Sequence, residues 1–154
     1  MRRVVTMGGT IALIAACAGG IRPGYAPLYE AVADTVAAVP AVAVEALVTG
    51  LAAEGLRVQW QSATEGYVES QWYDVVSRQS GSFDRTRPEQ FIRIRFFVDP
   101  VGTTASVLHG EAVSLRSVDP SRIERDTEMM LPPGNAGREI LTRVMRQVAR
   151  SLGG

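Results

Sequence analysis

Alternating hydrophobic and polar residues mark the clearest predicted strand of the chain, over residues 91–98. Hydrophobic side chains occupy its even positions, whereas Arg93 and Arg95 lie between them on the opposite face. This period of two is typical of a strand that buries one face. We therefore expect the two arginines to project from a sheet face that the core does not cover.

A turn and a partner strand are expected to follow this strand. Residues 99–102 place Pro at the second position and Gly at the fourth, a pattern typical of a β-turn. Residues 103–117 form the expected partner strand, in which the hydrophobic parity changes between Leu108 and Val113. A β-bulge near Gly110 would reconcile the two parities.

An earlier hairpin is predicted around Gly66. Polar residues alternate with Val58 and Trp60, and hydrophobic residues further along share the parity of Trp72. A three-residue loop at 64–66 keeps both hydrophobic sets on one face and pairs Val58 with Trp72. It also gives Gly66 the positive φ of a bulged turn. This register directs both tryptophans towards the core.

Two helices are predicted from a hydrophobic period near that of the α-helix. The first spans 41–54, with Pro40 in its first turn and Gly55 as its C-terminal cap. The second begins after Asn135, whose side chain suits an N-cap. Its hydrophobic face comprises Ile140, Leu141, Val144, Met145, Val148 and Leu152. Residues 28–39 fit either a helix or a strand that leads into a helix.

Together these elements predict one α+β domain over residues 28–154, in the order helix, strand, strand, strand, strand, helix. Alternating strands need cover on one face, and two amphipathic helices supply it. We therefore expect a four-stranded antiparallel sheet, built from two hairpins, with both helices packed on one face. Residues 77–90 and 118–134 are expected to form polar or irregular loops.

The N-terminal residues have the parts of a secretory signal. Arg2 and Arg3 precede an uncharged stretch over residues 4–16. This stretch is shorter than the about 20 residues that a membrane-spanning helix needs. It ends in the motif Ile14-Ala15-Ala16-Cys17.

This motif resembles the lipobox of bacterial lipoprotein precursors. The resemblance implies that a signal peptidase recognises the three residues before Cys17, and that Cys17 then carries acyl chains that anchor the protein to a membrane. Residues 1–16 would be the signal peptide, and residues 17–27 the lipidated cysteine and a flexible tether. An ordinary signal peptide cut nearby, or an uncleaved anchor helix, is the alternative.

The lipoprotein resemblance also implies a location. The protein is expected in the cell envelope, outside the cytoplasm. By analogy with Gram-negative lipoproteins, Ala18 after the cysteine favours the periplasmic face of the outer membrane over the inner membrane.

Composition narrows the possible functions. The 154 residues carry 16 basic and 16 acidic side chains, and this neutral balance argues against a nucleic-acid binder. One Cys and one His exclude a disulfide framework and a Cys/His zinc cage within the chain. Every basic residue is Arg, which excludes P-loop and Schiff-base lysine chemistry.

Three local motifs have both a chemical and a structural interpretation, and we favour the structural one for each. His109 suits a general base or a metal ligand, but it has no Cys or second His beside it. Glu124, Asp126 and Glu128 suit a hard cation, yet they alternate with arginines and lack the Gly of a calcium loop. Residues 134–137 suit an anion or, equally, a helix cap. We therefore predict no catalytic residue, no metal, no cofactor and no enzymatic activity.

The open sheet face and the polar loop form the expected partner surface, because Tyr and Arg are enriched at protein interfaces. An ordinary solvated surface is the alternative interpretation. The residues of this surface are Arg93, Arg95, Gln59, Gln61, Tyr67, Tyr73, Arg78, Arg85 and Arg87.

The mature domain resembles small α+β envelope lipoproteins, among them accessory lipoproteins of outer-membrane assembly machinery. The resemblance lies in the topology and in the strand entries Gly55-Leu56-Arg57-Val58 and Gly66-Tyr67-Val68. We expect a lipid-anchored protein with a non-catalytic binding or scaffolding role, as an accessory component of an envelope or membrane complex. The alternative is a lipoprotein that binds a small apolar ligand or a lipid between sheet and helices.

Overall fold

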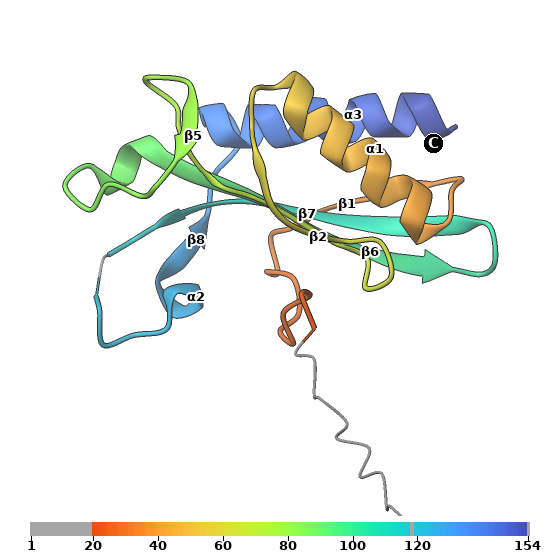
Figure 1. Ribbon diagram of the computed structural model, residues 1–154, viewed down its shortest axis with the longest axis horizontal. Coiled ribbons are helices and arrows are strands. Elements are labelled where there is room, and N and C mark those ends of the chain that lie inside the picture. The colour runs from red at the N-terminus through yellow and green to blue at the C-terminus, as the bar shows by residue number, and fades with distance from the viewer. Residues whose placement is uncertain (1–19, 118, 154) are drawn as a thin grey trace, which may run out of the picture.

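An antiparallel β-sheet with two long helices on one face forms the centre of the fold (Figure 1). The structure is a computed structural model that describes residues 20–117 and 119–153. The described residues have the expected α+β composition. The prediction of a four-stranded sheet with two helices is wrong, because they form eight strands and three α-helices.

Strands and helices follow one another along the described residues. In chain order they are β1 (Val32–Val36), α1 (Pro40–Ala53), β2 (Val58–Ser62), β3 (Tyr67–Ser70), β4 (Trp72–Asp74), β5 (Gln79–Gly81), the 3₁₀ helix η1 (Pro88–Gln90), β6 (Phe91–Val101), β7 (Ala105–Leu115), α2 (Glu124–Thr127), β8 (Glu128–Met130) and α3 (Ala136–Leu152).

The long hairpin of β6 and β7 is the axis of the sheet. The other edge of β6 pairs with β3 and β4, and the other edge of β7 pairs with β1 and β8. The short strands β2 and β5 extend the sheet beyond β3 and β4. Residues 77–90 and 118–134 therefore contribute strands, a 3₁₀ helix and α2, rather than only the loops that were expected.

The register of β6 and β7 is continuous from the pair Arg93–Val113 to the pair Val101–Ala105. No bulge interrupts it at Gly110, and the turn follows Val101 instead of beginning at Asp99. Both parities of β7 are buried, because chain segments cover both faces of the sheet. The change of hydrophobic parity therefore needs no bulge, and this part of the prediction is wrong.

The hairpin of β2 and β3 confirms the positive φ of Gly66, which is +62°. A Cβ at Gly66 would lie 2.0 Å from the carbonyl oxygen of Val98, so the position requires glycine. The predicted pairing of Val58 with Trp72 is wrong, since Val58 pairs with Ser70 and a register shift follows it. This shift leaves Trp60 half exposed instead of in the core.

The two long helices, α1 and α3, begin where the sequence predicts. α1 begins at Pro40, directly after β1, which shows that the ambiguous stretch 28–39 contains a strand. Asn135 caps α3 by accepting a hydrogen bond from the amide of Gly137 at 2.9 Å. None of the helices in the described part of the chain is both long and apolar enough to cross a bilayer.

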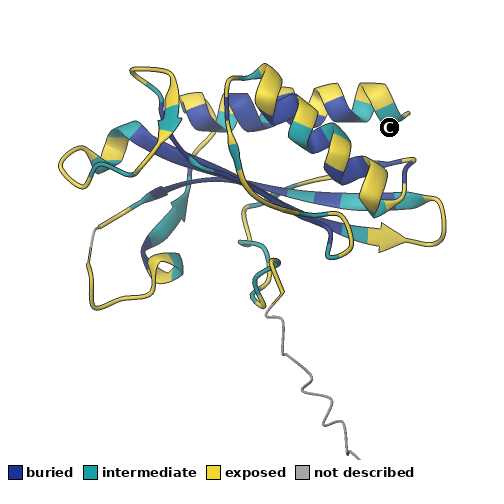
Figure 2. Ribbon diagram, viewed as in Figure 1, coloured by how far each residue is buried: buried dark blue, intermediate teal, exposed yellow. Residues whose placement is uncertain are grey.

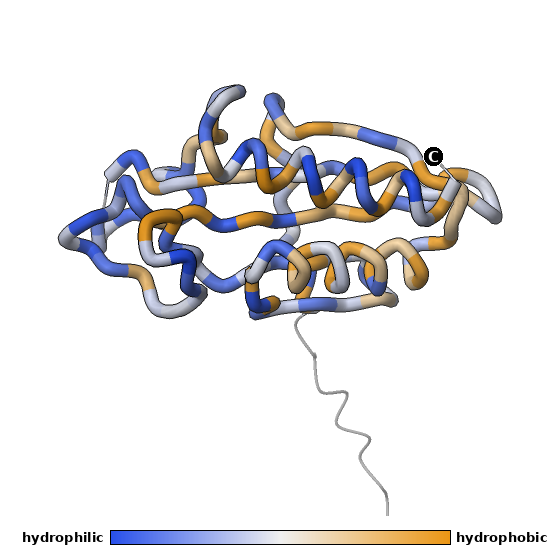
Figure 3. The backbone as a smooth tube through the Cα atoms, turned by 90° about the horizontal axis from the view of Figure 1, so that it is seen from above, coloured by the Kyte–Doolittle hydropathy of each residue, from blue (hydrophilic) through white to orange (hydrophobic). Residues whose placement is uncertain are grey.

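The main hydrophobic core lies between the sheet and the pair α1 and α3. Figure 2 shows the inner sides of both helices and the centre of the sheet as buried. Hydrophobic and hydrophilic stretches recur along the helical coils in Figure 3, as a one-sided core requires. The largest fully buried members of this core are Leu47, Leu51, Leu56, Ile94, Phe96, Leu108 and Leu141.

The opposite face of the sheet, which we call the polar face, is also covered. Residues 20–31, α2 and β8 lie on this side in Figure 1. The predicted signal peptide and Cys17 lie outside the described residues. The polar face is where the charged residues of the sheet meet.

Candidate functional site

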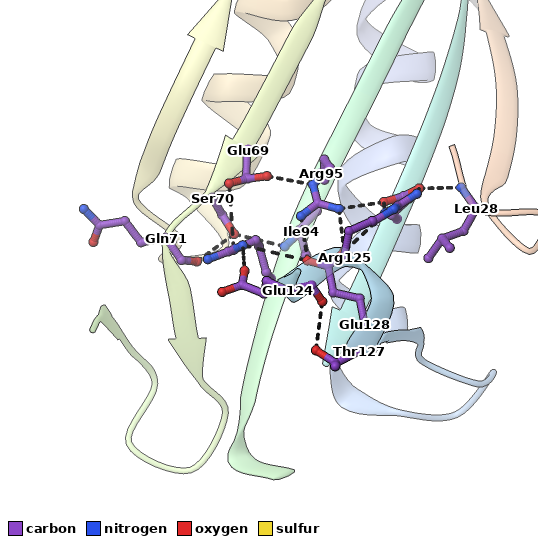
Figure 4. Close-up of polar contacts among 12 residues, drawn as sticks. Leu28, Glu69, Ser70, Gln71, Ile94, Arg95, Glu124, Arg125, Thr127 and Glu128 are labelled. Carbon is purple, nitrogen blue, oxygen red and sulfur yellow. Dashed lines mark hydrogen bonds and ion pairs between the residues drawn. The ribbon is translucent and has the colours of Figure 1, made fainter. Parts of the chain in front are cut away.

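Seven charged residues form a connected cluster on the polar face (Figure 4), which we call the charge cluster. They come from β3, β6, β7, α2 and β8, and they link through hydrogen bonds and ion pairs. The members are Glu69, Arg93, Arg95, Glu111, Glu124, Arg125 and Glu128.

Arg95 lies at the centre of the charge cluster. The sheet register places it directly between Glu69 on β3 and Glu111 on β7. Its Nε donates to Glu69 at 2.7 Å, its Nη1 to Glu111 at 3.1 Å and its Nη2 to Glu128 at 2.8 Å. The side chain is only 2% exposed, so each nitrogen needs such a partner.

Arg125, from α2, joins the cluster to the N-terminal segment. It donates to both carboxylate oxygens of Glu111, at 2.8 and 3.0 Å, and to Glu128 at 3.2 Å. Its Nη2 also donates to the carbonyl oxygen of Ala26 at 3.0 Å. The irregular region around α2 therefore packs on the sheet through charge-assisted hydrogen bonds.

Arg93 is bound differently. Its guanidinium stacks over the ring of Trp72 at 4.1 Å, and its Nη1 donates to Glu124. Its Nε is buried and has no hydrogen-bond partner among the described residues, because the nearest oxygen of Glu69 is 3.9 Å away. Arg93 is thus held by stacking, by one hydrogen bond to Glu124 and by longer ion pairs with Glu69 and Glu128, while part of its donor capacity is unused.

The N-terminal residues 20–28, which we call the docked segment, lie on the polar face. They include most of the stretch that was expected to be a flexible tether. The ring of Tyr25 lies 4.2 Å from the guanidinium of Arg125, and the amide of Leu28 donates to Glu111 at 2.5 Å. At the other end Arg22 forms an ion pair with Asp99 at 2.8 Å.

The environment keeps the cluster ionised. Burial by itself would raise the pKa of Glu128, but hydrogen bonds from Arg95 and Arg125 outweigh it and lower that pKa. Burial would lower the pKa of Arg95, and the glutamates, Glu128 first, instead raise it. Burial raises the pKa of Tyr67, whose hydroxyl donates to Glu69 at 2.6 Å. None of these three shifts brings a pKa towards neutrality, so the groups are suited to holding structure rather than exchanging protons.

A pocket of about 490 Å³ opens over the cluster. Its charged lining includes Arg93, Glu124 and Arg125, and its apolar lining comprises Ile21, Pro23, Tyr25, Trp60 and Ile123. This volume lies in the usual range of small-molecule pockets, roughly 300–1,000 Å³. The pocket is therefore a site where a ligand with both charged and apolar parts can bind.

The structure gathers only some of the predicted surface residues at this site. Arg93, Arg95 and Tyr67 line the pocket, but all three are buried instead of forming a solvated face. Tyr73 belongs to the hydrophobic core on the other side of the sheet. The other five predicted residues are exposed and do not line this pocket, namely Gln59, Gln61, Arg78, Arg85 and Arg87.

Several residues of the site were not predicted from the sequence. Glu69, Glu111, Arg125 and Tyr25 carry many of its contacts. Glu69 and Glu111 did leave a signal, because both lie opposite Arg95 once the strands are aligned correctly. Tyr25 left none, since no local pattern connects it with the sheet.

The acidic motif around α2 and His109 have structural contacts within the described residues. Glu124 and Glu128 contact arginines, and no group of three or more His, Cys, Asp or Glu side chains in the described residues is arranged to hold a metal. His109 is a half-buried strand residue that pairs with Phe97. A comparison with protein-family models and a search of the curated proteins both find no match for this chain.

Proposed function

We propose that this protein is a lipid-anchored cell-envelope protein with a non-catalytic binding role, and that it binds at the pocket on the polar face. The single observation that carries the binding site is the position of the pocket beside the docked segment. Gly20 and Ile21, the first described residues after the lipobox, both line it. A lipid on Cys17 would therefore hold the mouth of the pocket close to the membrane.

Two properties of the site support binding rather than catalysis. The charged groups of its floor are ionised and paired, as the shifts of Arg95 and Glu128 indicate. The mouth carries exposed hydrophobic side chains, which are typical of binding surfaces. An accessory role in an envelope or membrane complex, in the outer membrane by analogy, is part of this proposal.

The alternative function, binding of a small apolar ligand, was expected to use a site between the sheet and the helices. A different location suits it better. The space between sheet and helices is filled by core side chains such as Leu47, Leu141 and Val144, each fully buried. The pocket on the polar face is the better site for a small ligand, because it is open and has an apolar wall.

The anchor is tested by metabolic labelling with a radiolabelled fatty acid in a bacterial host. The full chain is expected to take up label, and Cys17→Ser is expected to lose it, because Cys17 is the only cysteine. Ala18→Ser, which leaves the lipobox intact, is the matched control and should stay labelled. A wild-type chain without label would overturn the anchor.

The accessory role is tested by extracting the labelled protein from membranes with a mild detergent and measuring its native mass. Co-purification of the same envelope proteins in repeated preparations is expected. Trp60→Ala should weaken that association, whereas Val76→Ala, at another exposed hydrophobic residue, should not. A purely monomeric wild-type protein would overturn the role in a complex.

A further inference from the structure

Three exposed hydrophobic side chains meet at the pocket from distant parts of the chain. Ile21 is 43% exposed, Trp60 is 50% exposed and Ile123 is 73% exposed, and all three line the same pocket. They belong to the docked segment, to β2 and to the turn before α2. This convergence gives the pocket an apolar wall that a hydrocarbon group would cover.

Arg93 is the cation beside this wall whose donors are least used. Arg95 and Arg125 each donate hydrogen bonds to at least two glutamates of the charge cluster, whereas Glu69 and Glu128 lie 3.9 and 3.8 Å from Arg93, beyond hydrogen-bond distance. Arg93 donates to Glu124 alone, and that side chain is 49% exposed. The buried Nε of Arg93 has no hydrogen-bond partner among the described residues, and an unpartnered buried donor favours a ligand that supplies an acceptor.

We propose that the pocket binds a membrane lipid with an anionic phosphate headgroup. A headgroup oxygen pairs with the guanidinium of Arg93 in place of the exposed carboxylate of Glu124. The acyl part lies against Ile21, Trp60 and Ile123. Guanidinium groups bind phosphate oxygens through charge-assisted hydrogen bonds, which suits Arg93 to this role.

The source of the lipid follows from the position of the anchor, and in this one respect the inference rests on the proposed function. Cys17 precedes Gly20 by three residues, and Gly20 lines the pocket. The Cα atoms of these residues are therefore at most about 11 Å apart. An acylated Cys17 would bring the pocket to the headgroup layer of the membrane, which contains anionic phospholipids.

Lipid binding is measured on the full chain carrying Cys17→Ser, so that the result does not depend on acylation. The protein is held in a detergent with an uncharged headgroup and titrated with dihexanoyl phosphatidylglycerol or dihexanoyl phosphatidylcholine. Tryptophan fluorescence reports binding, because Trp60 lies at the pocket and Trp72 stacks on the guanidinium of Arg93. Native mass spectrometry counts the bound lipids, and we expect one phosphatidylglycerol with clear preference over phosphatidylcholine.

Two variants of opposite expected effect identify the site. Arg93→Gln should weaken phosphatidylglycerol binding by about tenfold or more, as expected for loss of a charged hydrogen bond. Glu124→Gln should strengthen it, because the competing carboxylate is removed, and a folding defect would not produce that result. Arg146→Gln, on the exposed side of α3, should leave it unchanged.

The outcomes separate this inference from the proposed anchor. Equal binding of the two lipids, or unchanged affinity in both Arg93→Gln and Glu124→Gln, would overturn the lipid site. A lipid site with the expected variant effects stands even where the wild-type chain takes up no fatty-acid label. A labelled chain that binds no phosphatidylglycerol would keep the anchor and overturn the site.

Discussion

Arg95 is the residue on which the charge cluster depends. Its three guanidinium nitrogens donate to three glutamates, with Nη1 shared between Glu111 and Glu128, and both of these have side chains that are at most 1% exposed. A buried ion pair adds little stability over a well-packed apolar pair, but the loss of one partner leaves a buried charge unpaired.

Replacing Arg95 should therefore be costly. Arg95→Met is expected to lower the free energy of unfolding by about 3–5 kcal/mol, as measured by urea denaturation. Arg143→Met is the control, because Arg143 pairs with Glu54 at the surface and should change stability by at most about 1 kcal/mol. A loss as small as that of the control would contradict a central role for Arg95.

The lowered pKa of Glu128 makes stability depend on acid pH. A carboxyl group whose folded pKa lies below its unfolded value, about 4.3 for Glu, stabilises the fold above that value. This contribution is lost as the pH falls through the folded pKa, which hydrogen bonds from Arg95 and Arg125 hold down against the effect of burial. Glu128→Gln is expected to be less stable at pH 7 and to lose less stability on acidification. Parallel acid dependence of the two proteins in urea denaturation would contradict this.

Two glycines with the same backbone conformation allow the cost of backbone strain to be measured separately from the cost of steric crowding. Gly66 and Gly102 both have φ of +62°, but a Cβ at Gly66 meets Val98 whereas a Cβ at Gly102 meets nothing within 4 Å. Gly102→Ala should cost about 1–2 kcal/mol from the left-handed conformation alone. Gly66→Ala should cost about 1–3 kcal/mol more, because β2, β3 and β6 must move apart. Equal losses of thermal stability in the two variants would show that the contact with Val98 is not tight.

At the scale of elements, the long regular segments could be predicted and the short ones could not. The periods of α1, α3 and β6 recur over enough residues to identify the element type. β5 and β8 are three residues each, and they exist because β4 and β7 offer them hydrogen bonds. No three-residue pattern contains that information.

The candidate site could not be predicted because it depends on the register of three strands and on segments, distant in the sequence, that cover the polar face. The arginines of β6 were expected to be exposed to solvent, because the two predicted helices can cover only one face of the sheet. Glu69 and Glu111 flank Arg95 only in the correct alignment of three strands. An expected bulge at Gly110 would have shifted one of them away. The docked segment and α2 then close the face from regions that have no strand or long helix of their own.

The N-cap of α3 offers a test at this scale. Asn135→Ala should lower the free energy of unfolding by about 1 kcal/mol, because the amide of Gly137 loses its acceptor. Asn135→Ser retains an oxygen that accepts the same hydrogen bond and should restore most of the loss. Equal stability of the Ala and Ser variants in urea denaturation would show that the cap contributes nothing.

At the scale of the whole molecule, the docked segment joins the chain's N-terminal part to the sheet face opposite α1 and α3. It is bound at one end through Arg22 and at the other through Leu28, with Tyr25 packed between arginines and Phe97. An anchor on this segment would therefore set which face of the domain approaches a membrane.

Docking is tested by hydrogen exchange at the amide of Leu28, which donates to the buried Glu111. This amide should be protected in the wild-type protein. Tyr25→Ala should accelerate its exchange, because the ring that packs the segment onto Arg125 is lost. Tyr29→Ala removes a fully exposed ring and should leave the rate unchanged. Equal rates in the two variants would contradict the docking role of Tyr25.

The docked segment would lengthen the N-terminal connection to the domain if it detached from the sheet. Residues 20–28 would span at most about 30 Å if they were fully extended. In the structure they lie against the sheet instead of extending away from it. A pull on the N-terminal side would load the half-exposed pair of Arg22 and Asp99 first and the buried link of Leu28 to Glu111 last. Peeling would lengthen the N-terminal segment in two steps and would remove Ile21, Pro23 and Tyr25 from the pocket wall as it proceeds, so the reach of the segment and the integrity of the pocket are mechanically coupled.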